Sequence, residues 1–165
     1  MSEHHNKRAA EIIKEILYIT IASVSADGQP WNTPVYSAFD KDLNYYWFSD
    51  KNSQHSQNVR GNNKVLLVIY NSIVPEGTGE GVYVKATVSE LNEPNEILAA
   101  KAVLDERVDK EKERDAENYM DDAVLRGYKA TALQVWMNDD DKDEGGNYVR
   151  DIRVEVPLDV LKGLL

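Results

Sequence analysis

The chain has 165 residues, of which 42% are apolar and 29% are charged, and its formal net charge is −10 at pH 7. This length and composition predict one folded domain over residues 1–165. The absence of cysteine excludes disulfides, zinc–thiolate sites and thiol nucleophiles. No run reaches the roughly 20 apolar residues of a membrane span, and the negative charge disfavours nucleic acid. We therefore expect a cytoplasmic protein with neither a membrane nor a nucleic-acid partner.

The first third of the chain alternates between helical and extended patterns. Apolar residues at helical spacing predict an amphipathic helix over about residues 3–17. A strand pattern follows over residues 18–25, and Asp27-Gly28 predicts a tight turn into a second strand, residues 32–36. Pro34 has no N–H to donate to a neighbouring strand, so this second strand is expected at a sheet edge or a bulge.

Three further strands and a short helix are predicted in the middle of the chain. Residues 44–49 form an aromatic strand, and a polar loop leads from it into a short helix over residues 53–60. Residues 65–70 are almost continuously apolar, which places them at the centre of the sheet. Residues 82–91 alternate between apolar and polar, which predicts a half-buried strand.

The stretch from Trp47 to Asn58 suits a flat ligand that carries a phosphate. The strand offers an apolar wall, and the helix start with Ser53 and Ser56 offers N–H groups and a positive dipole end to an anion. Strands followed by capped helices also occur without any ligand, so both interpretations stay open. By itself, His55 is either a surface residue or an anion contact.

The last third of the chain is predicted to be a helical insertion followed by strands. Pro94 indicates the start of the insertion, which covers about residues 94–126 and carries a densely charged part, residues 105–122. We interpret that part as a solvated helix face or a connection between helices. Strands are expected over residues 128–137 and 152–156, before a short C-terminal helix or turn.

Two features invite a metal site without fulfilling the pattern of one. The acidic residues 139–144 lack the glycine and glutamate spacing of a calcium loop, so we expect an acidic hairpin loop there. Of the three histidines, His4 and His5 lie in a terminus expected to be mobile, which leaves His55 without a partner histidine. The sequence therefore predicts no metal site.

Five segments in this order resemble the FMN-binding split β-barrel family that includes pyridoxamine 5'-phosphate oxidase. They are residues 19–24 with Asp27-Gly28-Gln29-Pro30, Thr33-Pro34-Val35, Trp47-Phe48-Ser49, Ser53-x-His55-x-x-Asn58-Val59, and Val65-Leu66-Leu67-Val68. The resemblance implies a mainly β fold with flanking helices (α+β), built as a six-stranded antiparallel split β-barrel. It also implies a homodimer with FMN at the subunit interface.

The resemblance further implies which residues hold FMN. The residues bordering the isoalloxazine ring would be Thr33, Pro34, Val35, Trp47, Phe48 and Ser49. The residues holding the ribityl phosphate would be Ser53, Gln54, His55 and Asn58. Trp136, on a late strand, would either reach a flavin across the dimer or lie in the core.

The chain departs from the oxidase at four positions where the oxidase has basic residues that bind phosphate: Trp31, Tyr36, Gln54 and His55. Because charge-assisted contacts are about twice as strong as neutral ones, pyridoxamine 5'-phosphate is not expected as the substrate. The sequence favours a flavin-dependent oxidoreductase acting on an unidentified small molecule, and it indicates no catalytic residue. The alternatives are a non-catalytic flavin- or haem-binding, storage or stress-related module, and a structural interaction domain.

Overall fold

A computed structural model describes residues 3–108 and 115–165 of the chain. Its strands are β1 (Tyr18–Val24), β2 (Pro30–Tyr36), β3 (Ala38–Phe39), β4 (Asn44–Asp50), β5 (Lys64–Tyr70), β6 (Gly81–Leu91), β7 (Leu125–Lys142) and β8 (Tyr148–Glu155). Its helices are α1 (Glu3–Glu15), α2 (Gln54–Gly61), α3 (Pro94–Val108), the 3-10 helix η1 (Ala116–Tyr119) and α4 (Leu158–Leu164).

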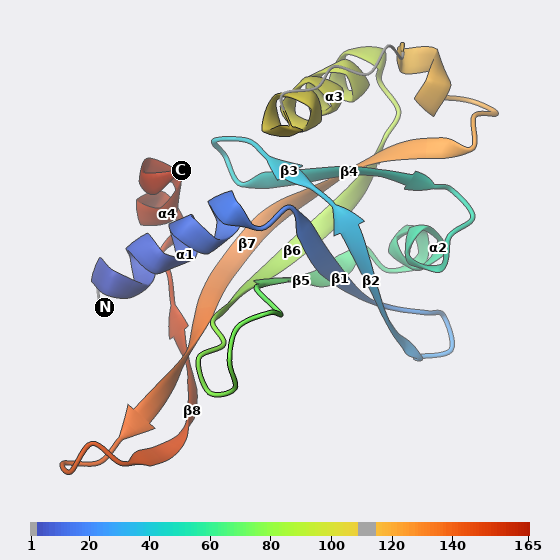
Figure 1. Cartoon of the computed structure of the whole chain (residues 1–165). Helices are drawn as coiled ribbons and strands as arrows, with labels where there is room; N and C mark the ends of the chain where they lie inside the picture. Colours follow the sequence, from blue (N-terminus) through green and yellow to red (C-terminus); the bar gives the residue numbers. More distant parts are fainter. Residues whose placement is uncertain (1–2, 109–114) are drawn as a thin grey trace.

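The strands form one antiparallel sheet in the order β2-β1-β5-β6-β7-β4-β3, with β8 beside β7 (Figure 1). The prediction of a mainly β, antiparallel split-barrel fold with flanking helices is confirmed. The sheet has eight strands rather than the expected six, since the two-residue β3 and the added β8 each count as a strand. Within the described residues β2 and β3 do not pair, so the sheet remains open between them.

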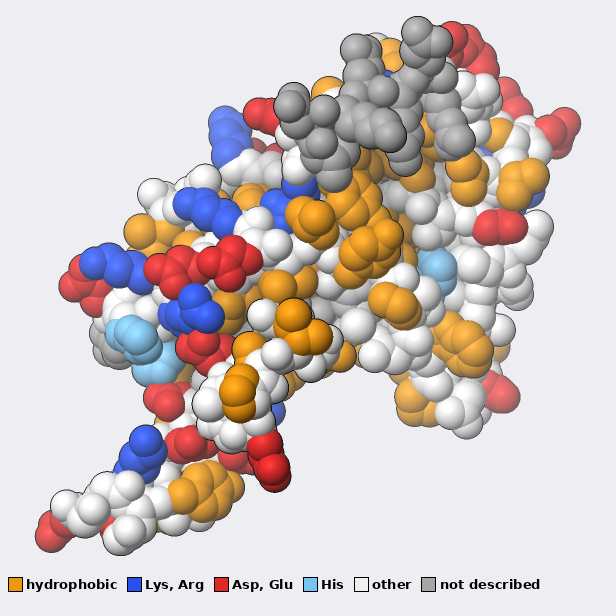
Figure 2. Space-filling view, in the orientation of Figure 1, with side chains coloured by type: hydrophobic (Ala, Val, Ile, Leu, Met, Phe, Trp, Pro, Cys, Tyr) orange, Lys and Arg blue, Asp and Glu red, His pale blue; other side chains and the backbone are white. Residues whose placement is uncertain are grey.

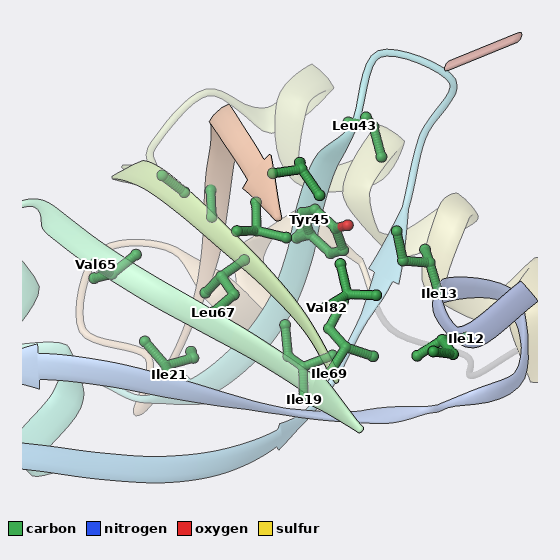
Figure 3. Close-up of a cluster of buried hydrophobic side chains, with 14 of the residues drawn as sticks. Ile12, Ile13, Ile19, Ile21, Leu43, Tyr45, Val65, Leu67, Ile69 and Val82 are labelled. Atoms are coloured by element: carbon green, nitrogen blue, oxygen red, sulfur yellow. The ribbon is translucent and has the colours of Figure 1, made fainter. Parts of the chain in front are cut away.

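The core lies on the inner side of this curled sheet. Alternate residues of β1, β4, β5 and β6 point inward. On β6 these are Val82, Val84, Ala86 and Val88, each at most 5% exposed, as their spacing predicts. Figure 3 shows the inward side chains of β1, β5 and β6 meeting Ile12 and Ile13 of α1. Burying this many aliphatic side chains supplies the main driving force for folding.

The positions of the strands agree with the predictions made from proline and from apolar runs. Strand β2 lies at the sheet edge, where Pro34 stands opposite Thr20 of β1. Strand β5 lies between β1 and β6, inside the sheet. The turn before β2 contains Gly28 with φ +87°, a left-handed conformation that glycine adopts without strain.

The N-terminus and the acidic segment both differ from the predictions. His4 and His5 belong to α1, and the Nε2 atom of His5 lies 2.8 Å from Oδ2 of Asp139, so this part of the terminus is anchored. Strand β7 continues to Lys142, because residues 139–141 pair with β8, and only residues 143–147 form the turn. The acidic residues therefore lie mostly on a strand rather than in a loop.

The helical region forms a small second cluster over β4. Helix α3 begins at Pro94 as predicted, and its Ile97 and Ala100 pack with Ala116 and Tyr119 of the η1 region. Residues 109–114, part of the charged segment, lie outside the described residues. In the part of the chain that is described, none of the helices has the length and apolar character needed to cross a membrane.

Candidate functional site

The main candidate site is a cavity of about 400 Å³ bounded by β2, β4, α2 and α3, which we call the β2–β4 cavity. The residues that line it are Tyr18, Pro34, Val35, Tyr36, Phe48, Ser49, His55, Lys101, Leu104, Asp105, Tyr119 and Leu125. Figure 2 shows apolar side chains gathered in the hollowed middle of the face of the molecule that it draws. Its volume falls in the range of about 300–1,000 Å³ that is usual for sites of small ligands and cofactors.

Two pairs of aromatic rings form much of the wall of the β2–β4 cavity. The rings of Tyr18 and Tyr36 meet edge to face with their centroids 5.9 Å apart. The rings of Phe48 and Tyr119 lie 4.1 Å apart and join β4 to the α3 and η1 region. Phe48 can lie flat against β7 because Gly127 faces it: a Cβ atom at Gly127 would stand 2.8 Å from Cε1 of Phe48.

His55 enters the β2–β4 cavity from the first turn of α2 and is 6% exposed. Burial lowers the pKa of His55 below its ordinary value, so its imidazole is neutral near pH 7. The N-cap residue Ser53 has an extended backbone but makes no side-chain cap bond within the described residues. The first N–H groups of a helix have no acceptor inside the helix, so those of α2 remain available to a ligand.

Behind His55, α2 is joined to β1 by hydrogen bonds between side-chain amides and a hydroxyl group. Asn58 is 4% exposed, and its Nδ2 donates to Oγ of Ser23 at 3.0 Å. Gln54 donates through Nε2 to Oδ1 of Asn58 at 2.8 Å. Gln54 and Asn58 also line a second, polar cavity of about 790 Å³ between α2 and the β1–β2 hairpin, which includes Trp31.

Helix α3 supplies the remaining wall of the β2–β4 cavity. Nζ of Lys101 lies 2.6 Å from Oδ2 of Asp105, and both side chains are less than 20% exposed. The hydroxyl of Tyr36 donates to the backbone oxygen of Leu104 at 3.3 Å, which ties β2 to α3. Among the described residues that line the cavity, Lys101 is the one lysine or arginine. No group of three His, Asp or Glu among the described residues is arranged to hold a metal ion.

The structure brings five of the eleven predicted cofactor residues together in this cavity: Pro34, Val35, Phe48, Ser49 and His55. The other six lie around it or away from it, as follows. Thr33 accepts a hydrogen bond from Nε1 of Trp31 at 2.8 Å, and Ser53 is the N-cap of α2. Gln54 and Asn58 line the polar cavity.

The two predicted tryptophans are not in the wall of the β2–β4 cavity. Trp47 is fully buried in the core and stacks on Tyr128 with the ring centroids 5.5 Å apart. Trp136 lies on the outer side of the sheet, opposite Tyr83 of β6. The α3 residues Lys101, Leu104 and Asp105 are not among the predicted cofactor residues, although the i, i+4 spacing of Lys101 and Asp105 in the sequence is typical of a helical ion pair.

The comparisons with known proteins agree with this architecture. A model of the family described as pyridoxamine 5'-phosphate oxidase matches residues 6–137. The chain therefore belongs to the pyridoxamine 5'-phosphate oxidase family. No curated protein matches the chain closely enough to be counted as a relative.

Three solved structures show the same fold. A candidate 5-nitroimidazole antibiotic resistance protein from Bacteroides thetaiotaomicron is 17% identical, with a TM-score of 0.65 over 79% of this chain and 81% of that one. A heme-binding protein from Mycobacterium smegmatis is 15% identical, with a TM-score of 0.67 over 99% of this chain and 62% of that one. HutZ, a heme storage protein from Vibrio cholerae, is 14% identical, with a TM-score of 0.63 over 78% of this chain and 90% of that one.

Proposed function

We propose that this chain binds FMN in the β2–β4 cavity and acts as a flavin-dependent oxidoreductase on a small molecule. The observation that carries the proposal is that Pro34, Val35, Phe48, Ser49 and His55 line one cavity. These residues come from three separate segments of the chain, and each segment is one that the family resemblance assigns to FMN. Their convergence supports a common ligand.

The cavity fits the ring system of a flavin. Its wall combines the aromatic pairs Tyr18–Tyr36 and Phe48–Tyr119 with the aliphatic side chain of Val35. A flat aromatic ligand gains from burial between such surfaces, because apolar area leaves water and rings stack. At about 400 Å³, the cavity has room for one ligand of cofactor size.

The fit to the phosphate depends on α2 rather than on arginine or lysine. The α2 N-terminus offers N–H groups and the positive end of the helix dipole, and His55 stands beside them. A bound phosphate would favour the charged imidazolium and so raise the pKa of His55 from its lowered value. Phosphate recognition is therefore expected to be weaker than with two arginines, and dependent on pH.

Bound FMN would supply the electron-transfer chemistry, while the protein would bind and orient it and keep water from the ring. With this division of roles, the residues of the cavity wall need not include a conventional catalytic acid or base. The ion pair of Lys101 and Asp105 and the ring of Tyr119 form the side that α3 and η1 contribute. A small substrate would contact this side, so α3 is where we place substrate selection.

The outer face of the sheet supports a homodimer with this site at its interface. Thr20, Val68, Tyr83 and Trp136 stand opposite one another across β1, β5, β6 and β7, and all four are half-buried. The same row continues on β2 to Pro34, which lines the cavity. The apolar residues that the described helices do bury lie in the inner core and in the cluster over β4. A second copy of the chain on the outer face would cover this apolar row and close the cavity.

A second candidate function is haem binding or storage without turnover. The observation that favours it is His55 in a cavity wall with several aromatic and aliphatic side chains, because haem iron in proteins is commonly held by one histidine. Two of the structural neighbours are described as heme-binding or heme storage proteins. Both ligands present a flat ring system to the protein, so the cavity shape alone does not separate them.

Titrations of the purified protein with FMN and with hemin separate these functions. Saturable quenching of FMN fluorescence, followed by anaerobic bleaching of the bound flavin with NADH or NADPH, supports the oxidoreductase. A set of electron acceptors that includes nitroimidazoles then tests for turnover. A Soret shift with hemin that is lost in His55→Ala, without any quenching of FMN, would replace the flavin proposal with the haem one.

A further inference from the structure

The buried face of α2 is mostly polar. Its buried residues are His55, Ser56, Asn58 and Val59, so only one of the four is apolar. A surface helix is usually oriented by a stripe of apolar residues facing the core. Helix α2 has one such residue, and its orientation must therefore depend largely on hydrogen bonds made by the polar ones.

Asn58 makes the side-chain bond that joins α2 to the β1–β2 hairpin, while Arg60 joins the helix to Glu90 on β6. The Nδ2 atom of Asn58 donates to Oγ of Ser23 on β1 at 3.0 Å, and Ser23 is itself only 2% exposed. Its Oδ1 accepts from Gln54 at 2.8 Å. Leaving a buried amide without partners is costly, so a rotation of α2 that breaks these bonds is disfavoured.

The bond between Asn58 and Ser23 connects α2 to the hairpin that carries one cavity wall. Ser23 pairs with Trp31 in the register of β1 and β2, and β2 continues to Pro34 and Val35. Asn58 thereby fixes α2 relative to the strand whose residues line the β2–β4 cavity. This contact lies behind the cavity rather than within its wall.

His55 lies three residues before Asn58, so the two side chains project from neighbouring positions on one face of α2. The bonds of His55 itself are local, since Oγ of Ser53 lies 3.3 Å from each ring nitrogen. These local contacts move with the helix and do not determine which way it faces. The link from Asn58 to Ser23 is the one that fixes α2 relative to the β1–β2 hairpin.

We propose that Asn58 is a positioning residue, whose buried amide sets the rotation of α2 and so holds His55 and the first-turn N–H groups at the cavity for a phosphorylated ligand. The inference rests on the proposed function, because it explains how a site that binds FMN would prefer FMN to riboflavin. It also gives Asn58 a different role from the direct phosphate contact that the sequence suggests.

The test compares Asn58→Ala with Val59→Ala, a matched change on the same buried face of α2. Dissociation constants for FMN and riboflavin are measured for each variant, and urea unfolding confirms that each one folds. Asn58→Ala should lower the preference for FMN about tenfold, whereas Val59→Ala should keep it within about twofold. Equal effects of the two changes, or an unchanged preference in Asn58→Ala, would overturn the proposal.

A measurement without flavin separates failure of this inference from failure of the proposed function. The pKa of His55, followed by NMR in the free protein, should move up toward its ordinary value in Asn58→Ala, because the ring turns toward solvent. The pKa of His55 should be unchanged in Val59→Ala. If Asn58→Ala does not fold, Ser23→Ala removes the partner hydroxyl and should shift the pKa of His55 in the same direction. An unchanged pKa of His55 in the folded variant would refute the positioning role of Asn58, whether or not FMN binds.

Discussion

Replacing His55 with alanine should weaken the binding of FMN much more than that of riboflavin. His55 is 6% exposed on the wall of the β2–β4 cavity and belongs to the first turn of α2. Riboflavin has the same ring system and lacks the phosphate, so it reports any damage to the ring site. The difference between the two ligands isolates the contribution of His55 to phosphate binding.

The magnitude follows from the value of one hydrogen bond to a charged group. Such a bond contributes about 1.5–3 kcal/mol, which corresponds to roughly tenfold to 150-fold in the dissociation constant. For riboflavin we expect a change below about threefold, because the imidazole would lose only packing against the ligand. The neutral imidazole of the free protein must take up a proton to make the charged bond, so the effect depends on pH.

The direction of the pH dependence follows from the lowered pKa of His55. Burial holds this pKa below its ordinary value in the free protein, and a bound phosphate would raise it. The preference for FMN over riboflavin should therefore grow as the pH is lowered through the raised pKa of His55 in the complex, where the imidazole becomes protonated. His55→Ala should flatten this dependence.

Fluorescence titrations at several pH values provide the measurement, with His4→Ala as the control. His4 is exposed on α1 and has no place in the cavity wall, so its removal should leave both dissociation constants unchanged. Equal weakening of FMN and riboflavin by His55→Ala would refute the phosphate role of His55. A preference for FMN that does not vary with pH would refute protonation on binding.

Three further predictions concern the packing and the assembly. Gly127→Ala should push Phe48 out of position, since the new Cβ would lie 2.8 Å from its Cε1. We expect a loss of about 1–3 kcal/mol in the free energy of unfolding, measured in urea, and weaker binding of FMN. Unchanged stability and unchanged FMN affinity would show that the cavity wall adjusts to the added methyl group. Leu67→Ala should lower the free energy of unfolding by about 3 kcal/mol because Leu67 is fully buried. Leu98 is 45% exposed, so Leu98→Ala should lower it by less than about 0.5 kcal/mol. Similar losses in the two variants would contradict the assigned core. Val68→Glu on the outer face should convert a dimer into monomers in light scattering, and a wild-type monomer at micromolar concentration would remove the dimer proposal.

Most of the strands could be predicted from local patterns in the sequence. The alternation over residues 82–91 identifies the inward side of β6, because neighbouring side chains of a strand point to opposite faces. The lack of an N–H at Pro34 and the start signal at Pro94 located a sheet edge and a helix start, since both depend on proline's own geometry.

The site was harder to predict because its walls come from distant parts of the chain. Trp47 and Phe48 are adjacent on β4, so they point to opposite sides, and only the folded sheet decides which one meets the cavity. Lys101 and Asp105 reach the cavity because α3 packs over β4, a contact that the local sequence does not encode. The extension of β7 to Lys142 was missed because acidic residues favour loops unless a partner strand, here β8, pairs with them.

A crystal structure of the protein soaked with FMN tests the central claim most directly. We expect electron density for the isoalloxazine ring in the β2–β4 cavity, against Val35 and Phe48, with the phosphate at the start of α2 beside His55. Density for FMN at another place on the protein would contradict this claim. A cavity without FMN density would also contradict it, if the protein in solution does not quench FMN fluorescence.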